Sequence, residues 1–173
     1  MASYSFVTKW FILASVERVW DALNDPERYH LWWPCFVEYR PLSPGASDVG
    51  SRGIRVVRGF LPYQLRYTTT ITEKIPPHQL AYDSDGDLTG RGRFVLASQP
   101  SGTDVTFYWD VETTGRVMNL LAPLLRPLFS WNHNWVMAAG EKGLRRWLAE
   151  PAARSVNPCP VERASSRSDP LRS

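Results

Sequence analysis

The chain has 173 residues, of which 43% are hydrophobic and 21% charged, close to an average globular domain. This excludes a collagen, a coiled coil and a wholly disordered chain, and no apolar stretch reaches the ~20 residues of a membrane-spanning helix. The formal net charge is +3, and residues 151–173, with four Arg, one Glu and one Asp, carry +2 of it. The basic balance therefore does not indicate a nucleic-acid partner for the folded part.

The two cysteines, Cys35 and Cys159, are too few for a disulfide framework, so we expect free thiols. Neither has a second Cys at metal-binding spacing, and the three histidines lie far apart in the sequence. We therefore predict neither a metal nor a cofactor. Residues 1–10 lack the continuous apolar core of a secretory signal, and the expected location is the cytoplasm.

The C-terminal residues 151–173 are rich in Pro, Ser and Arg and have no hydrophobic periodicity. Such a segment buries too little apolar surface to offset the entropy lost on ordering it. We predict one folded domain over residues 1–150, followed by a disordered tail.

The hydrophobic pattern predicts a strand, two short helices, six more strands and a long helix. Residues 4–13 alternate as a strand that is apolar on both faces, so we expect it either to be covered on both sides or to lie under a helix. Ser15 offers an N-cap for the first helix, and Asp25 with Pro26 offers the same signal for the second, which ends before Pro34. The further strands are predicted at 36–41, 53–60, 63–75, 79–84, 90–97 and 103–114, and their short connections indicate antiparallel pairing.

Alternate residues of these strands sort into an inner and an outer row. The predicted inner rows are large and aromatic, with Tyr63, Tyr67, Tyr82 and Trp109 among them. Arg58 is in phase with the apolar residues of its strand. We expect its guanidinium either to reach water at the sheet edge or to anchor a ligand anion or carbonyl.

The outer rows alternate in charge from strand to strand. Asp110 and Glu112 fall there, opposite Arg91 and Arg93, so cross-strand ion pairing is a better interpretation than a catalytic carboxylate pair. On the inner side, the row of Gly90 and Gly92 indicates either a bend or the close approach of another group.

The long helix is predicted over residues 117–149, kinked or split near its start by Pro123 and Pro127. Small residues, Gly140 among them, would bring the helix close to the sheet. Asn132 and His133 are polar neighbours on an otherwise apolar side, so they either bond to a nearby loop or strand or line a pocket. The predicted buried stripe comprises Leu121, Leu124, Leu125, Leu128, Asn132, Trp135, Val136, Ala139, Gly140, Gly143, Leu144 and Trp147.

This order of elements is similar to the START-like (SRPBCC, helix-grip) superfamily, and in particular to its polyketide cyclase/dehydrase branch, over residues 4–149. The matching segments are SVERVWDAL at 15–23, DPE at 25–27, WWP at 32–34, LPY at 61–63, GT at 102–103, NH at 132–133 and GEKGL at 140–144. The resemblance implies an α+β helix-grip fold, in which a curved seven-stranded antiparallel sheet, two short helices and a long C-terminal helix enclose an apolar cavity. It implies a ligand such as a lipid, sterol, quinone, polyketide or plant hormone. It does not by itself imply that the protein is an enzyme.

We therefore expect the protein to bind a hydrophobic small molecule, similar to a polyketide, a lipid or a quinone, between the sheet and the long helix. Its expected contacts are Arg58, Tyr63, Tyr67, Tyr82, Trp109, Asn132 and His133.

Three alternatives stay open. The first is an aromatase/cyclase acting on a poly-ketone, in which a Tyr or His shuttles a proton and Arg58 stabilises an enolate. The second is a lipid or quinone carrier that touches membranes transiently through Trp32, Trp33 and residues 117–127. The third is a protein-binding module with a filled cavity. The expected assembly is a monomer or a homodimer.

Overall fold

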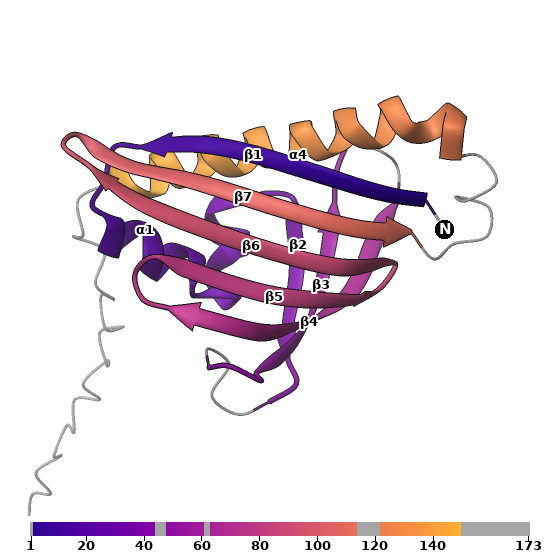
Figure 1. Ribbon diagram of the computed structural model, residues 1–173, viewed down its shortest axis with the longest axis horizontal. Coiled ribbons are helices and arrows are strands. Elements are labelled where there is room, and N and C mark those ends of the chain that lie inside the picture. The colour runs from indigo at the N-terminus through magenta and orange to yellow at the C-terminus, as the bar shows by residue number, and fades with distance from the viewer. Residues whose placement is uncertain (1, 44–47, 61–62, 114–121, 150–173) are drawn as a thin grey trace, which may run out of the picture.

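The computed structural model describes residues 2–43, 48–60, 63–113 and 122–149, which form a curved sheet with helices on one face (Figure 1). The predicted α+β helix-grip fold and the predicted order of elements are confirmed, with one additional 3-10 turn, η1. The elements are β1 (Ala2–Ile12), α1 (Val16–Leu23), η1 (Pro26–Arg28), α2 (Tyr29–Trp32), β2 (Phe36–Pro41), β3 (Arg52–Arg58), β4 (Gln64–Ile75), β5 (Gln79–Gly86), β6 (Leu88–Gln99), β7 (Gly102–Thr113) and α4 (Ala122–Ala149).

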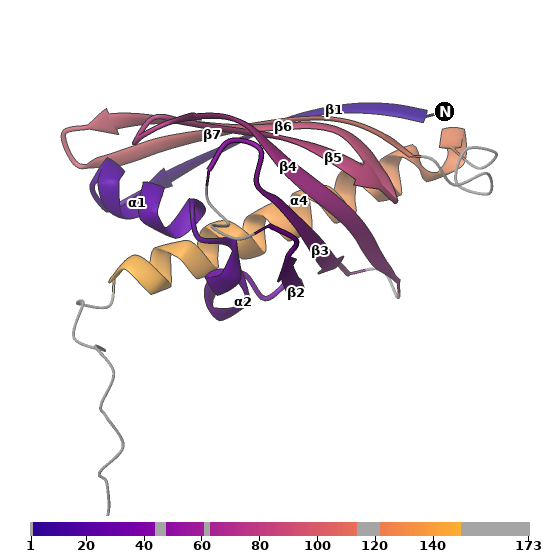
Figure 2. The same ribbon diagram turned by 90° about the horizontal axis from the view of Figure 1, so that it is seen from below.

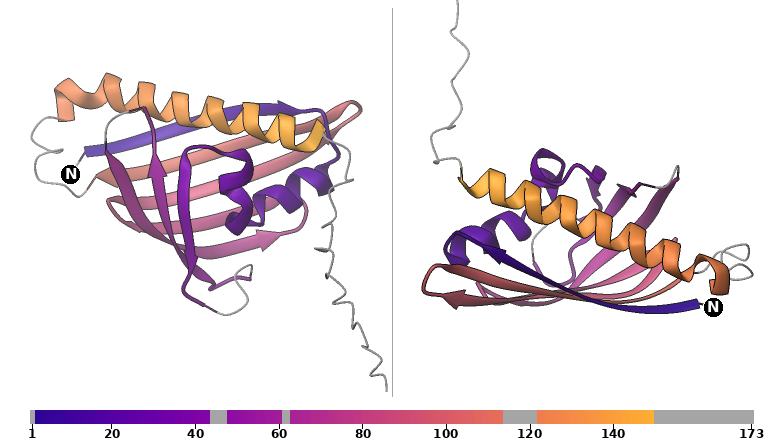
Figure 3. Two further views of the ribbon diagram at one scale, coloured as in Figure 1. Left: turned by 180° about the vertical axis from the view of Figure 1, so that it is seen from behind. Right: turned by 90° about the horizontal axis from the view of Figure 1, so that it is seen from above.

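The sheet has seven strands in the order β1-β7-β6-β5-β4-β3-β2, and every pair is antiparallel. From β2 to β7, strands that follow each other in the chain are therefore neighbours. Strand β1 pairs with β7 at one edge of the sheet, and β2 forms the other edge. Helix α4 lies across the concave face of the sheet (Figure 2). It begins near the N-terminus of the chain and ends near α1 (Figure 3). The sheet and α4 thus face each other across the interior of the domain.

Of the two arrangements expected for β1, the structure shows the second, because the strand lies under α4 and only one of its faces is covered. Tyr4, Trp10 and Ile12 face the interior and are buried, whereas Val7 is 61% and Leu13 75% exposed. The helices occupy only the concave side of the sheet, so the convex side of this edge strand is open to solvent.

The predicted phase of β3 is also wrong, by one residue. The prediction connected two strands through residues 61–62, which would place Phe60 opposite Tyr63. The last observed pair is instead Arg58 with Gln64, so the connection comprises residues 59–63. A shift of one residue exchanges the two faces of a strand. Arg58 and Phe60 are consequently exposed, and Arg55 faces the interior directly opposite Tyr67.

The charged rows lie on the solvent face as predicted, but among the described residues no ion pair joins Asp110 or Glu112 to Arg91 or Arg93, since Glu112 lies opposite Thr89 and Arg93 opposite Tyr108. Asp110 and Glu112 are exposed on β7. Arg91 lies between Asp83 and Asp110 in the register, and its Nε is 3.3 Å from Asp83 Oδ1. These carboxylates therefore belong to the solvent face and not to a catalytic pair.

Gly140 and Gly143 of α4 face Trp33 and Trp32 rather than the sheet, which corrects the predicted contact. A side-chain carbon on Gly140 would overlap the indole of Trp33, and one on Gly143 would overlap the main chain of Trp32. Both indoles are buried in the core. The prediction that Trp32 and Trp33 form an exposed membrane-facing lip is therefore wrong.

The buried stripe of α4 is shifted relative to the prediction. Leu128, Trp135 and Trp147 are each more than a third exposed, whereas Met137 and Leu148 are buried. Apolar side chains occur all around this helix, so their periodicity does not identify the buried face. Leu121 lies outside the described residues, as do the side chains of Leu124 and Leu125.

Residues 122–149 form one helix that continues through Pro127, so of the predicted kink or split, the split does not occur within this range. Pro123 is its second residue, where a backbone N–H would have no intrahelical partner in any case. Residues 117–121 and the tail predicted at 151–173 lie outside the described residues. Within the described ranges, no helix combines the length and the apolar character required to cross a bilayer.

The close contact of Gly140 predicts that Gly140→Leu will destabilise the protein. The larger side chain must displace Trp33, and overpacking of this kind costs ~1–3 kcal/mol despite the better helix propensity of leucine. Urea unfolding measures the difference. The control is Ala138→Leu on the exposed side of the same helix, which should change stability by less than ~0.5 kcal/mol. Equal stabilities of the two variants would contradict the observed packing of α4.

Candidate ligand-binding site

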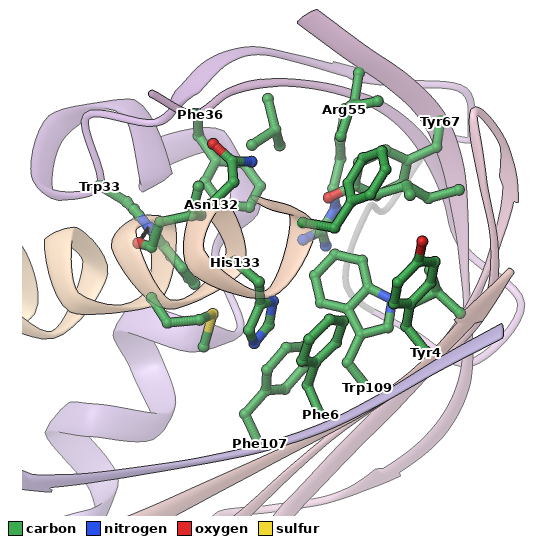
Figure 4. A pocket seen from close by; sticks show the side chains of 18 of the residues that line it. Tyr4, Phe6, Trp33, Phe36, Arg55, Tyr67, Phe107, Trp109, Asn132 and His133 are labelled. Atoms are coloured by element: carbon green, nitrogen blue, oxygen red, sulfur yellow. Dashed lines mark hydrogen bonds between the residues drawn. The ribbon is translucent and has the colours of Figure 1, made fainter. Parts of the chain in front are cut away.

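A narrow cavity separates the concave face of the sheet from α4 (Figure 4). Its wall is mostly aromatic and is built from β1, the α2 to β2 segment, β3 to β7 and α4. The cavity volume is about 90 Å³, which is room for several waters. A ligand with fused rings would require some of the lining side chains to move.

Arg55 enters the cavity from β3 and is 6% exposed. Its Nε donates a hydrogen bond to Thr69 Oγ1 at 3.1 Å. Its Cζ lies 5.1 to 5.9 Å from the centroids of four rings, those of Tyr29, Phe36, Tyr39 and Tyr82. Ring faces attract cations, more strongly when the pair is shielded from water. In the described part of the chain, no carboxylate forms an ion pair with this guanidinium.

The charge of Arg55 and the tyrosine hydroxyls around it influence one another. Burial lowers the pKa of Arg55, but the tyrosine oxygens raise it by more, so the guanidinium keeps its proton. Burial raises the pKa of Tyr67 to about 12 and also raises the pKa of Tyr29 and Tyr82, although Arg55 partly opposes each shift. The cavity therefore holds a permanent cation beside neutral phenols.

Glycines on the inner face make room for the side chains of this site. A side-chain carbon on Gly92 would lie 2.5 Å from Cζ of Tyr82, and one on Gly53 would overlap the ring of Tyr39. The close approach anticipated for Gly92 is thus made by a neighbouring tyrosine ring. These two glycines allow both rings to lie near Arg55.

His133 enters the cavity from α4. Its Nε2 lies 3.2 Å from Thr8 Oγ1, and its ring stacks on Phe6 with centroids 4.1 Å apart. Burial lowers the pKa of His133 from 6.5 to about 4, so the imidazole is neutral at physiological pH. It can therefore exchange a hydrogen bond with a ligand but adds no charge.

Asn132 has a structural bond as well as a place in the cavity wall. Its Oδ1 accepts a hydrogen bond from the backbone N–H of Phe60 at 3.0 Å, and its amide occupies the space beside Gly59. Both roles that the sequence left open for this residue are therefore realised. The bond joins α4 to the end of β3 at the rim of the cavity.

Two further polar atoms in the cavity wall are buried and without a hydrogen-bond partner among the described residues. They are the hydroxyl of Tyr63 and Nε1 of Trp109. Trp109 meets Tyr67 edge to face, with centroids 6.2 Å apart. An unpaired buried N–H or O–H is costly, and a ligand oxygen or a water would satisfy it.

The cavity brings together six of the seven residues predicted from the sequence: Tyr63, Tyr67, Tyr82, Trp109, Asn132 and His133. Arg58 is the exception, because it lies on the exposed face of β3. The sequence analysis missed Arg55 and Tyr29. Gly53, two residues before Arg55, was an available signal of a crowded inner row, but no local signal identifies Tyr29.

No metal centre or activated thiol is found in the described ranges. These residues contain no group of three or more His, Cys, Asp or Glu side chains arranged to hold a metal ion. Cys35 is a buried free thiol, and burial raises its pKa to about 11. It is therefore not a thiolate nucleophile at neutral pH.

The sequence matches one protein-family model. Residues 12–139, most of the folded part, match the family described as polyketide cyclase / dehydrase and lipid transport. None of the curated proteins matches the chain significantly.

Solved structures with the same fold are similar to this chain at low sequence identity. The Zhui aromatase/cyclase from Streptomyces sp. R1128 has a TM-score of 0.73 at 14% identity, covering 90% of this chain and 100% of that one. The protein TTHA0849 from Thermus thermophilus has a TM-score of 0.68 at 18% identity, covering 83% and 99%. The di-domain ARO/CYC BexL from the BE-7585A biosynthetic pathway has a TM-score of 0.63 at 17% identity, covering 82% of this chain and 50% of that one. These similarities establish the fold.

The lowered pKa of His133 predicts a loss of stability in acid. Because the unfolded state binds a proton near pH 6.5 and the folded state only near pH 4, stability contributed by neutral His133 is full above pH 6.5 and falls as the pH drops toward 4. Between about pH 7 and about pH 4.5 the loss should be ~2–3 kcal/mol. Urea unfolding at both pH values should show that His133→Gln removes this part of the pH dependence. The control His30→Gln, at an exposed position, should leave it unchanged.

Proposed function

We propose, since the chain belongs to the polyketide cyclase / dehydrase and lipid transport family, that it binds a hydrophobic small molecule in the cavity between the sheet and α4. The aromatic wall favours a flat, unsaturated ligand, because ring faces and edges offer large apolar contact to planar groups. A polyketide-like or quinone-like molecule has this shape together with several oxygen atoms.

Arg55 is the observation that carries the proposal. An isolated buried cation is costly, and here aromatic rings and the hydroxyls of Thr69 and Tyr29 partly compensate for the lost water. Nε is used by Thr69, and the guanidinium forms no ion pair in the described part of the chain. A carbonyl, enolate or carboxylate oxygen of the ligand would supply a negative or partly negative partner for the guanidinium.

Hydrogen-bond donors elsewhere in the wall add to this specificity. Tyr63 and Trp109 each hold a buried donor without a described partner. A ligand with a second oxygen could satisfy one of these donors while its first oxygen meets Arg55. The proposed ligand is therefore an apolar, ring-containing molecule that carries at least two oxygen acceptors.

Catalysis on a poly-ketone is the second candidate, and it rests on the guanidinium that lies beside neutral phenols. Arg55 could stabilise an enolate while a tyrosine hydroxyl supplies a proton. Binding without turnover is favoured, because the raised pKa of Tyr67 makes its hydroxyl a poor acid and the pKa of about 4 makes His133 a weak base. We also propose a cytoplasmic location, where a thiol such as Cys35 stays reduced.

Two naphthalene compounds that differ in charge test the role of Arg55. Wild-type protein should bind both 2-naphthoate, which is anionic, and 2-naphthalenemethanol, which is neutral, as measured by isothermal titration calorimetry. Arg55→Met should lower the affinity for 2-naphthoate by ~10-fold or more, because a hydrogen bond to a charged group contributes ~1.5–3 kcal/mol. The affinity for 2-naphthalenemethanol should fall by a smaller factor, because its neutral oxygen forms no ion pair with the guanidinium.

Arg58→Met is the matched control, since this arginine lies on the exposed face of the same strand. It should bind both compounds as the wild type does. Arg55→Met is expected to fold, because methionine removes the desolvation cost of a buried cation. Equal effects of the two variants on 2-naphthoate would exclude Arg55 as the anchor. Conversion of a poly-ketone by the wild type, abolished in Arg55→Met, would favour the enzyme over the carrier.

A further inference from the structure

Exposed aromatic side chains gather on the outer side of α4. Trp131 is 46% exposed, Trp135 41%, Leu128 37% and, from the end of β3, Phe60 62%. The ring of Phe60 meets Trp131 edge to face at 4.7 Å between centroids and Trp135 at 6.2 Å. We call these four residues the aromatic patch. A contiguous exposed group of this kind is characteristic of a binding surface, whereas single exposed apolar residues are ordinary.

The aromatic patch lies directly outside the cavity wall. Gly59 lines the cavity and Phe60 follows it outside, while on α4 Trp131 is outside and Asn132 inside. The hydrogen bond from the Phe60 N–H to Asn132 Oδ1 joins the two elements at this seam. The aromatic patch therefore borders the cavity along the contact between β3 and α4.

The same helix becomes basic toward its C-terminal end. Glu141 is the only acidic residue in 127–149, and it is paired with Arg145 at 2.7 Å. Lys142 and Arg146 form no ion pair within the described ranges. They line a groove of about 460 Å³ between α2 and α4, together with Leu31 and the half-exposed Trp147.

We propose that this side of α4 docks on a bilayer that contains anionic lipid, with the helix axis in the plane of the membrane. Tryptophan suits the interface because its ring is apolar and its N–H is polar. Lys142 and Arg146 would lie among the headgroups, where each cation strengthens binding about fivefold. The charge of the surface complements an anionic membrane, and no unpaired carboxylate of α4 within 127–149 opposes it.

The aromatic patch borders the cavity, so docking at this surface would bring the cavity next to the bilayer. A hydrophobic ligand that leaves a bilayer at this side reaches the seam between β3 and α4 without crossing water. The docking surface goes beyond the proposed ligand binding, because contact with a membrane requires neither Arg55 nor any particular ligand. The buried Trp32 and Trp33 take no part in it.

Vesicle flotation with the full chain tests the proposal. The wild type should float with vesicles in which about a third of the phosphatidylcholine is replaced by phosphatidylglycerol, more weakly with pure phosphatidylcholine, and less in high salt. Trp131→Ser with Trp135→Ser should lower binding at least ~10-fold. Lys142→Glu with Arg146→Glu should do the same for anionic vesicles only.

The control substitutions are at residues that are exposed away from α4, on the convex side of the sheet. Val7→Ser with Leu13→Ser, and separately Arg93→Glu, should bind vesicles as the wild type does. Every variant should keep its affinity for 2-naphthoate, which separates a failure of docking from a failure of the cavity.

Three outcomes would overturn the proposal. The first is a wild type that binds neither kind of vesicle. The second is full binding by both the double tryptophan variant and the Lys142→Glu, Arg146→Glu variant. This would assign the interaction to another part of the chain, such as residues 151–173 with their net positive charge. The third is a wild-type dimer that becomes a monomer on substitution of Trp131 and Trp135 in sedimentation experiments, because the aromatic patch would then be an interface between two copies.

Discussion

A guanidinium buried among aromatic rings is the constraint around which the interior of this domain is arranged. Arg55 can remain charged there only if its surroundings replace the lost water, and ring faces together with the Thr69 hydroxyl do so. The rings must in turn be held in place. The hydroxyl of Tyr29 donates to the Leu23 carbonyl, and the ring of Tyr82 lies over Gly92. The solid core at the α1 end therefore supports the polar part of the cavity.

The sequence was sufficient for the elements, their order and the charged solvent rows of β5, β6 and β7, because these depend on local signals. Caps, prolines and clusters of Gly, Ser and Asp separate the elements, and charges that alternate between neighbouring strands identify the outer face. The same alternation placed Tyr67, Tyr82 and Trp109 correctly in the cavity wall. Each of these strands has one large row and one polar row, so its phase is unambiguous.

The phase of β3 was not available from such signals. Its true inner row reads Gly53, Arg55, Val57 and Gly59, a sequence typical of a surface, whereas Ile54 and Val56 on the other row are typical of a core. Only the register with β4 decides, and that depends on how many residues connect the two strands. The inner row is unusual because it contains few large apolar side chains. Arg55 contacts aromatic rings, and Gly53 leaves room for the ring of Tyr39. Helix α4 was ambiguous for a related reason, since its outer aromatic patch is as apolar as its buried face.

The electrostatics of the cavity bear on whether the site is built to bind or to react. An acid or base catalyst needs a pKa close to its working pH. Burial raises the pKa of the Tyr67 hydroxyl to about 12 and lowers the pKa of His133 to about 4. Neither Tyr67 nor His133 is therefore poised to change its charge at neutral pH. Among the described residues that line the cavity, Arg55 is the one fixed charge, and a fixed charge orients a ligand oxygen whether or not a bond is later formed. Turnover would therefore require a substrate with an acidic C–H, such as the one between two carbonyl groups of a poly-ketone. Arg55 would stabilise the enolate that forms when this proton leaves.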